Sequence, residues 1–131
     1  QKLHGELPVL NLPTDRPRPP VQTFKGAQAK LVLPQTLKKE LKNLSRQQGV
    51  TLFMTLLTAF KILLYRYTGQ TDILVGSPIA NRNRAEIESL IGFFVNVLVL
   101  RTNLSGNQNF LDLLACVKST ALEAYVHQDL P

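Results

Sequence analysis

The sequence is short of the residues that build disulfides and metal sites. Its 131 residues include one cysteine, two histidines and no tryptophan. A single cysteine, Cys116, excludes an internal disulfide framework and fits a reducing compartment, so we expect a cytoplasmic protein. His4 and His127 are isolated from each other and from Cys116, which excludes a metal cluster of ordinary spacing. Cys116 falls in a helical apolar pattern, and we expect it to be a buried filler.

Common catalytic signatures are absent as well. Neither GxGxxG nor GxxxxGK[ST] occurs, which excludes the usual phosphate-binding loops. The tripeptide Gly76-Ser77-Pro78 lacks the flanking pattern of a GxSxG nucleophile elbow. Glu86 and Glu88 lie two residues apart and face different ways on a helix, so they do not form a paired-carboxylate device. His127 is a general base in principle, but a structural role at a helix C-terminus is the simpler interpretation.

Charge is sparse and moderately basic. Charged residues make up 18% of the chain, and the net charge is +6. The basic residues are spread along the chain without interleaved aromatics, so we do not expect nucleic-acid binding. A basic surface of this kind suits an acidic protein partner. The start of the chain has no apolar signal segment, and Lys61 and Arg66 interrupt its most apolar helix, so we expect no membrane span.

The chain divides into a connector and one α/β unit. Five prolines at positions 8, 13, 17, 19 and 20 predict an extended connector over residues 1–27 that lies on a surface. Residues 28–131 predict an α/β (α+β) unit in the order β-α-α-β-β-α, a mixed sheet packed by about three helices. Because the chain opens on Gln1, we expect it to be excised from a longer protein. The predicted elements are strand 29–33, helix 35–48, helix 52–67, strand 72–79 with a break or edge at 76–78, a helical turn at 86–90, strand 94–101 and helix 110–126.

Two of these elements carry expectations about burial. Apolar residues lie on nearly every side of helix 52–67, which predicts a central buried helix. The run 90–100 is apolar and β-prone, which predicts a strand covered on both faces. Asn96 lies within that run, and a buried amide without partners costs about 1–3 kcal/mol. Either the protein satisfies Asn96 internally, or the strand borders a wet channel where the amide meets a substrate.

Four ordered motifs carry a resemblance to a known family. Residues 91–96 (IGFFVN) resemble the IGxFVN motif of condensation domains in nonribosomal peptide synthetases, and residues 127–131 (HQDLP) resemble the start of their HQDxPFE motif. Residues 65–82 (YRYTGQTDILVGSPIANR) and 12–19 (LPTDRPRP) resemble two further stretches of the family. The resemblance covers nearly the whole chain. One departure is Val97, where the family usually has Thr.

The resemblance implies a fold and a division of labour. The family's fold is similar to chloramphenicol acetyltransferase, with two α/β subdomains and a tunnel between them. Its catalytic HHxxxDG motif belongs to the first subdomain and does not occur in these 131 residues. The chain therefore resembles the C-terminal subdomain, entered through the connector and truncated at the HQDxP motif. We expect it to have no catalytic residue of its own and to be inactive alone.

The resemblance also implies partners and site residues. The family joins a carrier-bound acyl or peptidyl thioester to a carrier-bound aminoacyl amine, as part of antibiotic and secondary metabolite biosynthesis. The implied partners are the N-terminal subdomain, upstream and downstream peptidyl carrier proteins and an adenylation domain. No cofactor is bound directly, since the phosphopantetheine arms belong to the carriers. The implied site residues are Asn96, Gly92, Phe94 and Ser77 in the tunnel wall, Arg82 and Arg84 in a bridging loop, and His127, Gln128 and Asp129 in a structural motif.

Two alternatives remain open at this point. The chain could be a non-catalytic module that docks carrier proteins through the basic face of helix 35–48, although plain solvation is the simpler explanation of such a face. An epimerisation domain of the same superfamily is the other, and the IGFFVN form argues against it. In either case we expect half of a two-subdomain fold to expose apolar surface and to aggregate when isolated.

Overall fold

Local capping sets the ends of the two longest helices. The computed structural model describes residues 3–82, 85–106 and 108–128. In α2 (Leu52–Thr68), the Thr51 side chain accepts a hydrogen bond from the Met54 backbone, and Gly69, at a φ of 69°, ends the helix. In α4 (Phe110–Val126), Asn109 and Asp112 form a reciprocal capping box. Both helices lie where the sequence predicts them.

The first helix, α1 (Gln35–Gln47), follows Pro34 and also matches its prediction. It packs on α2 through a buried polar contact, in which the Ser45 and Thr55 hydroxyls lie 2.8 Å apart. Ser45 also donates to the Leu41 carbonyl at 2.7 Å. These bonds satisfy hydroxyls that would otherwise be costly to bury.

The sheet is a two-stranded antiparallel hairpin of β1 (Asp72–Ile79) and β2 (Asn96–Asn103), with Asp72 opposite Asn103 and Ile79 opposite Asn96. Burial alternates along β2, so Leu98, Leu100 and Thr102 are buried while Val97 and Val99 are exposed. The prediction that this strand is covered on both faces is wrong. Helices α2 and α4 cover one face, and the described residues place no element over the other.

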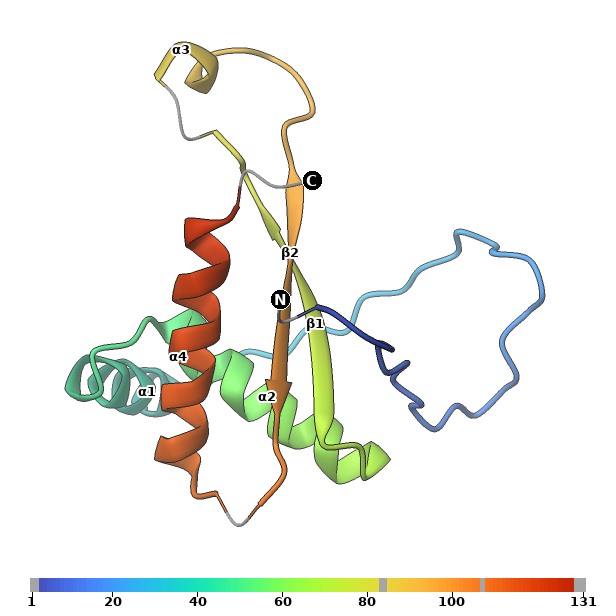
Figure 1. Cartoon of the computed structure of the whole chain (residues 1–131), viewed down its shortest axis with the longest axis horizontal. Coiled ribbons are helices and arrows are strands. Elements are labelled where there is room, and N and C mark those ends of the chain that lie inside the picture. Colours follow the sequence, from blue (N-terminus) through green and yellow to red (C-terminus); the bar gives the residue numbers. More distant parts are fainter. Residues whose placement is uncertain (1–2, 83–84, 107, 129–131) are drawn as a thin grey trace.

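The core lies between that face of the hairpin and the two long helices (Figure 1). One apolar cluster joins α2, β2 and α4, and a smaller one lies toward the end of the hairpin where β1 begins. The larger cluster consists of Met54, Leu57, Leu98, Leu100, Leu114, Val117 and Ala121. Burial of such side chains is the main stabilising term, at roughly 25 cal/mol per Å² of apolar surface.

The predicted strand at 29–33 is wrong. This segment has no regular structure, and Leu31 and Val32 are 87% and 88% exposed. A strand needs a neighbour to take its backbone hydrogen bonds, and no described strand lies beside these residues. The observed order is therefore α1-α2-β1-α3-β2-α4, with an antiparallel sheet in place of a mixed one.

The proline-rich connector touches the body over a short stretch. The Gln70 side chain donates to the Val9 carbonyl at 3.0 Å and accepts from the Asn11 backbone at 2.8 Å. Leu10 and Leu12 pack against the smaller core cluster. Residues 13–34 are exposed, and Figure 1 shows this part of the chain swinging out beyond the hairpin before it reaches α1.

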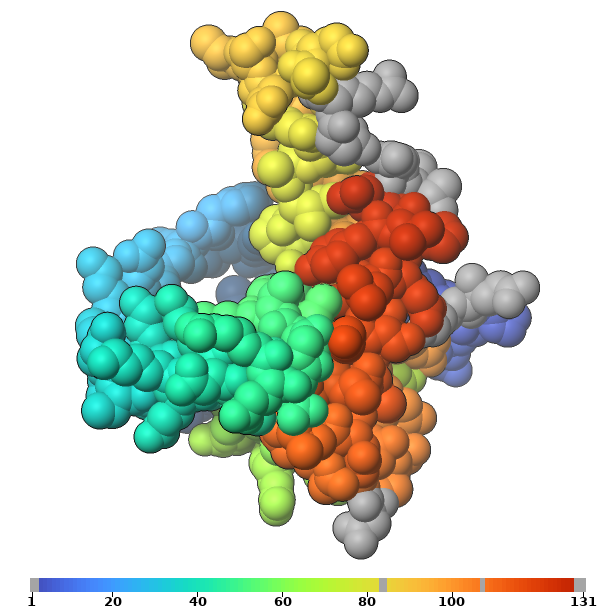
Figure 2. Space-filling model, turned by 90° about the vertical axis from the view of Figure 1, so that its left-hand side faces the viewer, coloured from blue at the N-terminus to red at the C-terminus, as the bar shows by residue number. Residues whose placement is uncertain are grey.

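The described residues 80–82 and 85–95 form an arm that leaves the hairpin between β1 and β2. The arm contains the short helix α3 (Ala85–Glu88), which confirms the helical turn predicted near 86–90, and β2 begins at Asn96, two residues later than predicted. Figures 1 and 2 show the arm standing clear of the helices. None of its described residues is buried.

Two expectations about helix burial also fail. In α2, one face is buried and the other exposes Phe53, Leu56 and Phe60, because neighbours cover only one side. Cys116 is exposed. It lies two residues from the buried Leu114, which at about 100° per residue turns it to the opposite side of α4.

Among the described residues, no single helix has the length and hydropathy of a membrane span. Helices α1 and α2 meet that criterion only when taken together, and they meet at a bend of 105°. The described residues likewise form no group of three or more His, Cys, Asp or Glu side chains able to hold a metal ion.

Candidate functional site

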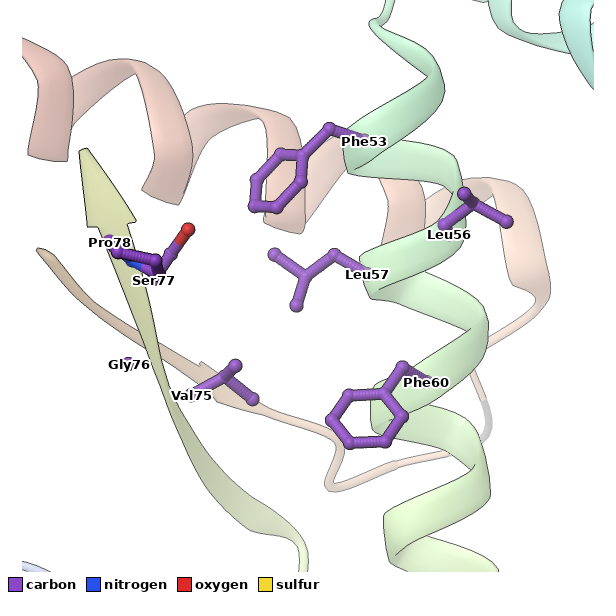
Figure 3. Close-up of a pocket in the computed structure, with 8 residues that line it drawn as sticks. All are labelled: Phe53, Leu56, Leu57, Phe60, Val75, Gly76, Ser77 and Pro78. Carbon is purple, nitrogen blue, oxygen red and sulfur yellow. The ribbon is translucent and has the colours of Figure 1, made fainter. Parts of the chain in front are cut away.

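An apolar groove of about 360 Å³ lies between α2 and β1 (Figure 3). From α2 it is lined by Phe53, Leu56, Leu57 and Phe60, and from β1 by Val75, Gly76, Ser77 and Pro78. The helix residues recur at intervals of three and four, so they share one side of α2. In Figure 3, Val75 and Ser77 extend from β1 toward that side.

The groove offers apolar contact surface but, among the residues described, no side chain that transfers a proton. Ser77 supplies the one polar side chain of its described lining, and none of the lining residues is ionisable in the ordinary pH range. Of the four residues predicted in the tunnel wall, Ser77 alone lines this groove.

Asn96 lies on the same face of the hairpin as Ser77. Residues paired across an antiparallel ladder point to one side, and here Ile79 pairs with Asn96 and Ser77 with Leu98. The Asn96 amide nitrogen donates to the Gln128 carbonyl at 3.1 Å, and its oxygen accepts from the Val97 backbone at 2.8 Å. Its amide thus joins the start of β2 to the chain after α4.

The first two residues of the HQDLP segment, His127 and Gln128, directly follow the last residue of α4. The His127 ring Nδ1 lies 2.9 Å from the Glu123 carbonyl, and the His127 backbone donates to Ala124. These bonds satisfy carbonyls of the last turn of α4, and the structural role of the motif stays a prediction. Asp129, predicted as part of the same motif, lies outside the described residues.

Gly92 and Phe94 lie in the arm, next to Arg82. The Phe94 ring centre is 4.4 Å from the Arg82 guanidinium carbon. A Cβ on Gly92 would come within 3.0 Å of Phe94 Cε2, so the missing side chain leaves room for the ring. Because both residues lie in the arm, these two predicted tunnel residues do not line the α2–β1 groove. Arg84, predicted beside Arg82 in the bridging loop, lies outside the described residues.

Lys61 is a buried charged residue that was not among the predicted site residues. Its side chain is fully buried, and its Nζ donates to the Leu100 carbonyl at 2.7 Å and to Thr102 Oγ1 at 2.6 Å. Burial lowers the pKa of Lys61 to about 8, with partial compensation from the negative charge of Asp72. The spacing Leu57-Lys61-Leu64 was the available signal, because it places Lys61 on the buried stripe of α2.

On the opposite face of the hairpin, Arg101 and Asp72 form a bidentate ion pair with a shortest distance of 2.7 Å. Hydrogen bonding to Arg101 holds the pKa of Asp72 below its ordinary value. The Arg101 guanidinium also donates to the His4 carbonyl at 3.4 Å, which links the start of the connector to the sheet.

Comparison with known proteins identifies the family. The model of the condensation domain matches residues 1–131. The chain belongs to the condensation domain family. The α/β class predicted for it and the family resemblance are therefore both confirmed.

Curated relatives of this condensation-domain segment are much longer proteins. It is 60% identical over 131 residues to a linear gramicidin synthase polypeptide of Brevibacillus parabrevis and 46% identical to phosphinothricin tripeptide synthetase PhsC of Streptomyces viridochromogenes. Each match covers the whole chain. The chain spans 3% of the first relative and 12% of the second.

Solved structures give the same fold. The chain superposes with a TM-score of 0.89 and 25% identity on the four-domain nonribosomal peptide synthetase AB3403, covering 93% of this chain and 9% of that one. The X-domain from teicoplanin biosynthesis gives a TM-score of 0.87 and 28% identity, covering 93% of this chain and 27% of that one.

Proposed function

We propose that this chain is part of a condensation domain that forms an amide bond between two carrier-bound substrates. The acyl or peptidyl donor is a thioester on the phosphopantetheine arm of one carrier protein, and the acceptor is the amine of an aminoacyl thioester on another. The observation that carries the proposal is the full-length family match, together with 46–60% identity to peptide synthetases over all 131 residues.

The chain's own contribution is to bind and position. The groove lining has no ionisable group, and the 131 residues contain no HHxxxDG motif, so the proton-transferring histidine is assigned to a segment outside this sequence. A wall that excludes water strengthens the electrostatic stabilisation of a tetrahedral intermediate. Holding the amine and the thioester carbonyl at attacking distance lowers the entropic part of the barrier.

Ser77 and Asn96 are the side chains that we assign to the tunnel wall. They share one face of the hairpin, at the end that leads into the arm. The bonds of Asn96 to the Gln128 carbonyl and to the Val97 backbone hold its amide in one orientation, as positioning a substrate requires. Gly92 and Phe94 contribute indirectly, because they shape the arm that precedes Asn96 in the sequence.

A segment replacement tests the function directly. The 131 matching residues of the linear gramicidin synthase polypeptide are replaced by this chain, so that the host supplies the rest of the domain. Peptide-bond formation between loaded carriers is followed by mass spectrometry of the carrier-bound product. We expect product with this gramicidin synthase chimera, and background only when the second histidine of the host's HHxxxDG motif is changed to Ala. A folded chimera that forms no product contradicts the proposal, and a product with inverted stereochemistry points to epimerisation.

Asn96→Ala in the chimera tests the role of the tunnel wall. Loss of an oriented amide from the wall predicts a fall in turnover of about 10-fold to 100-fold. Asn103→Ala, the same change at the other end of β2, is the matched control and should leave turnover within about 2-fold. Equal turnover of the Asn96 variant and the control would assign Asn96 a structural role only.

A carrier-docking role has one observation in its favour. Lys38, Lys39, Lys42 and Arg46 on α1 are all exposed. Binding of a phosphopantetheinylated carrier to the chain is measured at low and high salt, and a docking face of this kind predicts affinity that falls as salt rises. Absence of binding at both salt concentrations rules this role out.

A further inference from the structure

The arm has no buried apolar side chains among its described residues to stabilise its conformation. Its apolar side chains point to solvent, with Leu90 51%, Ile91 105% and Phe93 90% exposed. The short helix α3 is one turn long, and a helix of that length is not stable in isolation. Yet the arm carries the first five residues of the IGFFVN motif, whose last residue is Asn96.

The Arg82 side chain cross-links the arm through hydrogen bonds from its guanidinium to backbone carbonyls of residues 87–92. Its Nη1 donates to three backbone carbonyls, those of Leu90 at 2.6 Å, Ile87 at 2.8 Å and Glu88 at 3.2 Å. Its Nη2 donates to the Gly92 carbonyl at 3.2 Å. Carbonyls at a helix end lack partners within the helix, and a cation there is favourable.

Phe94 completes this arrangement from the other side. The Arg82 guanidinium lies over the Phe94 ring, and the ring in turn lies against the bare backbone of Gly92. A cation over an aromatic face contributes to binding in addition to the hydrogen bonds. Three residues separated along the sequence thus form a single packed unit.

The backbone conformation of the residue before Arg82 orients the Arg82 side chain toward these partners. Asn81 has a φ of 49°, a left-handed conformation that Asn tolerates better than most residues. It lies two residues after the end of β1, so β1 anchors the start of the arm and β2 anchors its end. The arm is therefore tied to rigid elements at both ends and to Arg82 in the middle.

From this geometry we infer that Arg82 is a positioning residue of the condensation reaction. Its guanidinium, spread over four carbonyls and one aromatic ring, holds residues 87–94 in the shape that presents the IGFFVN motif to the tunnel. The inference rests on the proposed function. It assigns to Arg82 an action through Gly92 and Phe94, with no contact to substrate.

Lysine cannot replace arginine in this role. A guanidinium is planar and carries five N–H groups in a fixed fork, whereas an ammonium is a compact point charge. The single lysine ammonium cannot reach the separate sets of carbonyls that Nη1 and Nη2 of the guanidinium reach, and it stacks less well on the Phe94 ring. Arg82→Lys therefore keeps the charge and removes the geometry.

The test compares Arg82 variants in the gramicidin synthase chimera. We expect turnover to fall about 100-fold in Arg82→Ala, the size of effect that a misplacement of about 1 Å produces, and at least 10-fold in Arg82→Lys. Arg66→Lys, the same change at an exposed arginine of α2, is the matched control and should keep turnover within 2-fold of the unchanged chimera. The melting temperatures of all three variants should agree within a few degrees, because the arm lies outside the core.

Chemical rescue separates positioning from mere folding. Added millimolar guanidinium chloride should restore part of the turnover of Arg82→Ala and none of that of Arg82→Lys, where the lysine side chain fills the space. Guanidinium does not rescue a protein that is globally destabilised, because it is itself a denaturant. An independent variant, Gly92→Ala, should lower turnover as well, since its Cβ displaces Phe94 from beneath Arg82.

The outcomes are distinct. If the chimera without further substitutions forms no product, the proposed function is overturned. An active chimera whose Arg82→Lys variant matches Arg66→Lys overturns the positioning role while leaving the function in place. A fall in turnover without guanidinium rescue, accompanied by a lower melting temperature, assigns Arg82 to stability and also overturns it.

Discussion

The body of the chain and its arm use opposite means to hold a shape. In the body, formed by the three long helices and the hairpin, apolar side chains such as Leu100 and Leu114 are buried to 1% exposure. In the arm, the apolar residues Ile91 and Phe93 face solvent and polar bonds from Arg82 lie inside. The body is therefore stabilised by buried apolar side chains, whereas the arm exposes its apolar residues and is held by polar bonds, a pattern typical of interaction surfaces.

The difference also separates stability from function. A well-packed core is sensitive to the loss of any methylene, and an exposed surface tolerates most changes. We therefore expect substitutions in the body to lower the free energy of unfolding and substitutions in the arm to lower turnover. Four predictions, ordered from the largest expected effect on stability to the smallest, can sharpen or break this contrast.

Leu114→Ala should lower the free energy of unfolding by about 3–5 kcal/mol, because it opens a cavity between α4 and the hairpin. Urea denaturation of the chain measures the effect. Leu111→Ala, on the same helix at 46% exposure, is the matched control and should cost less than about 1 kcal/mol. Similar losses for both variants would show that α4 does not pack as described.

Lys61 should make stability depend on pH in the alkaline range. Its pKa is about 8 in the folded chain against 10.5 when unperturbed, so below pH 8 both states are charged and the folded state bears the full cost of burial. As pH rises from 8 to 10.5 the folded lysine loses its proton first, and stability should increase by about 3 kcal/mol. Urea midpoints of wild type and Lys61→Met between pH 7 and 10.5 measure this. The variant should lack the increase, and parallel pH profiles would contradict the prediction.

The Asp72–Arg101 pair should contribute modestly, and its pH dependence should fall in the acid range, with stability again rising as pH rises. Its side chains are 29% and 24% exposed, so water screens the attraction and keeps the contribution to stability small. Because the folded pKa of Asp72 is lowered, this stabilisation is present above the ordinary carboxyl pKa of 3.8 and is lost as pH falls below it. Thermal melts of Asp72→Asn and wild type at neutral pH and at about pH 3 should show a smaller difference between the two proteins at the acid pH.

Phe93→Ser in the arm should change the free energy of unfolding by less than about 0.5 kcal/mol, since the ring is 90% exposed. The same variant should reduce aggregation of the isolated chain, measured by light scattering, because it removes exposed apolar surface. A large loss of stability would mean that the arm packs on the body, and the contrast between the two regions would then fail.

Much of the local structure could be predicted from single residues. Thr51, Gly69 and Asn109 end or begin helices through bonds within a few residues, so the bounds of α2 and α4 follow from the sequence. The four ordered motifs likewise indicate the family from the sequence alone. The contacts of the proposed tunnel wall, by contrast, would involve the rest of the proposed condensation domain, and no local pattern within these 131 residues reports them.

Burial could not be predicted in the same way. The strand expected at 29–33 has the right alternation but no neighbour to bond with among the described strands. Helix α2 has apolar residues all round, yet the side that is buried includes Thr55, Thr58 and Lys61, which find hydroxyl and carbonyl partners there. Whether a side chain is covered depends on elements far away in the chain.

The sequence by itself determined the helices, their caps and the family, because these depend on neighbouring residues and ordered motifs. Only the tertiary structure decided that Lys61 meets Leu100, that Asn96 is tied to Gln128, and that Arg82 gathers four carbonyls of the arm. Hydrogen bonds act over about 3 Å, and the residues that these bonds join lie up to 39 positions apart, so folding alone brings them within reach.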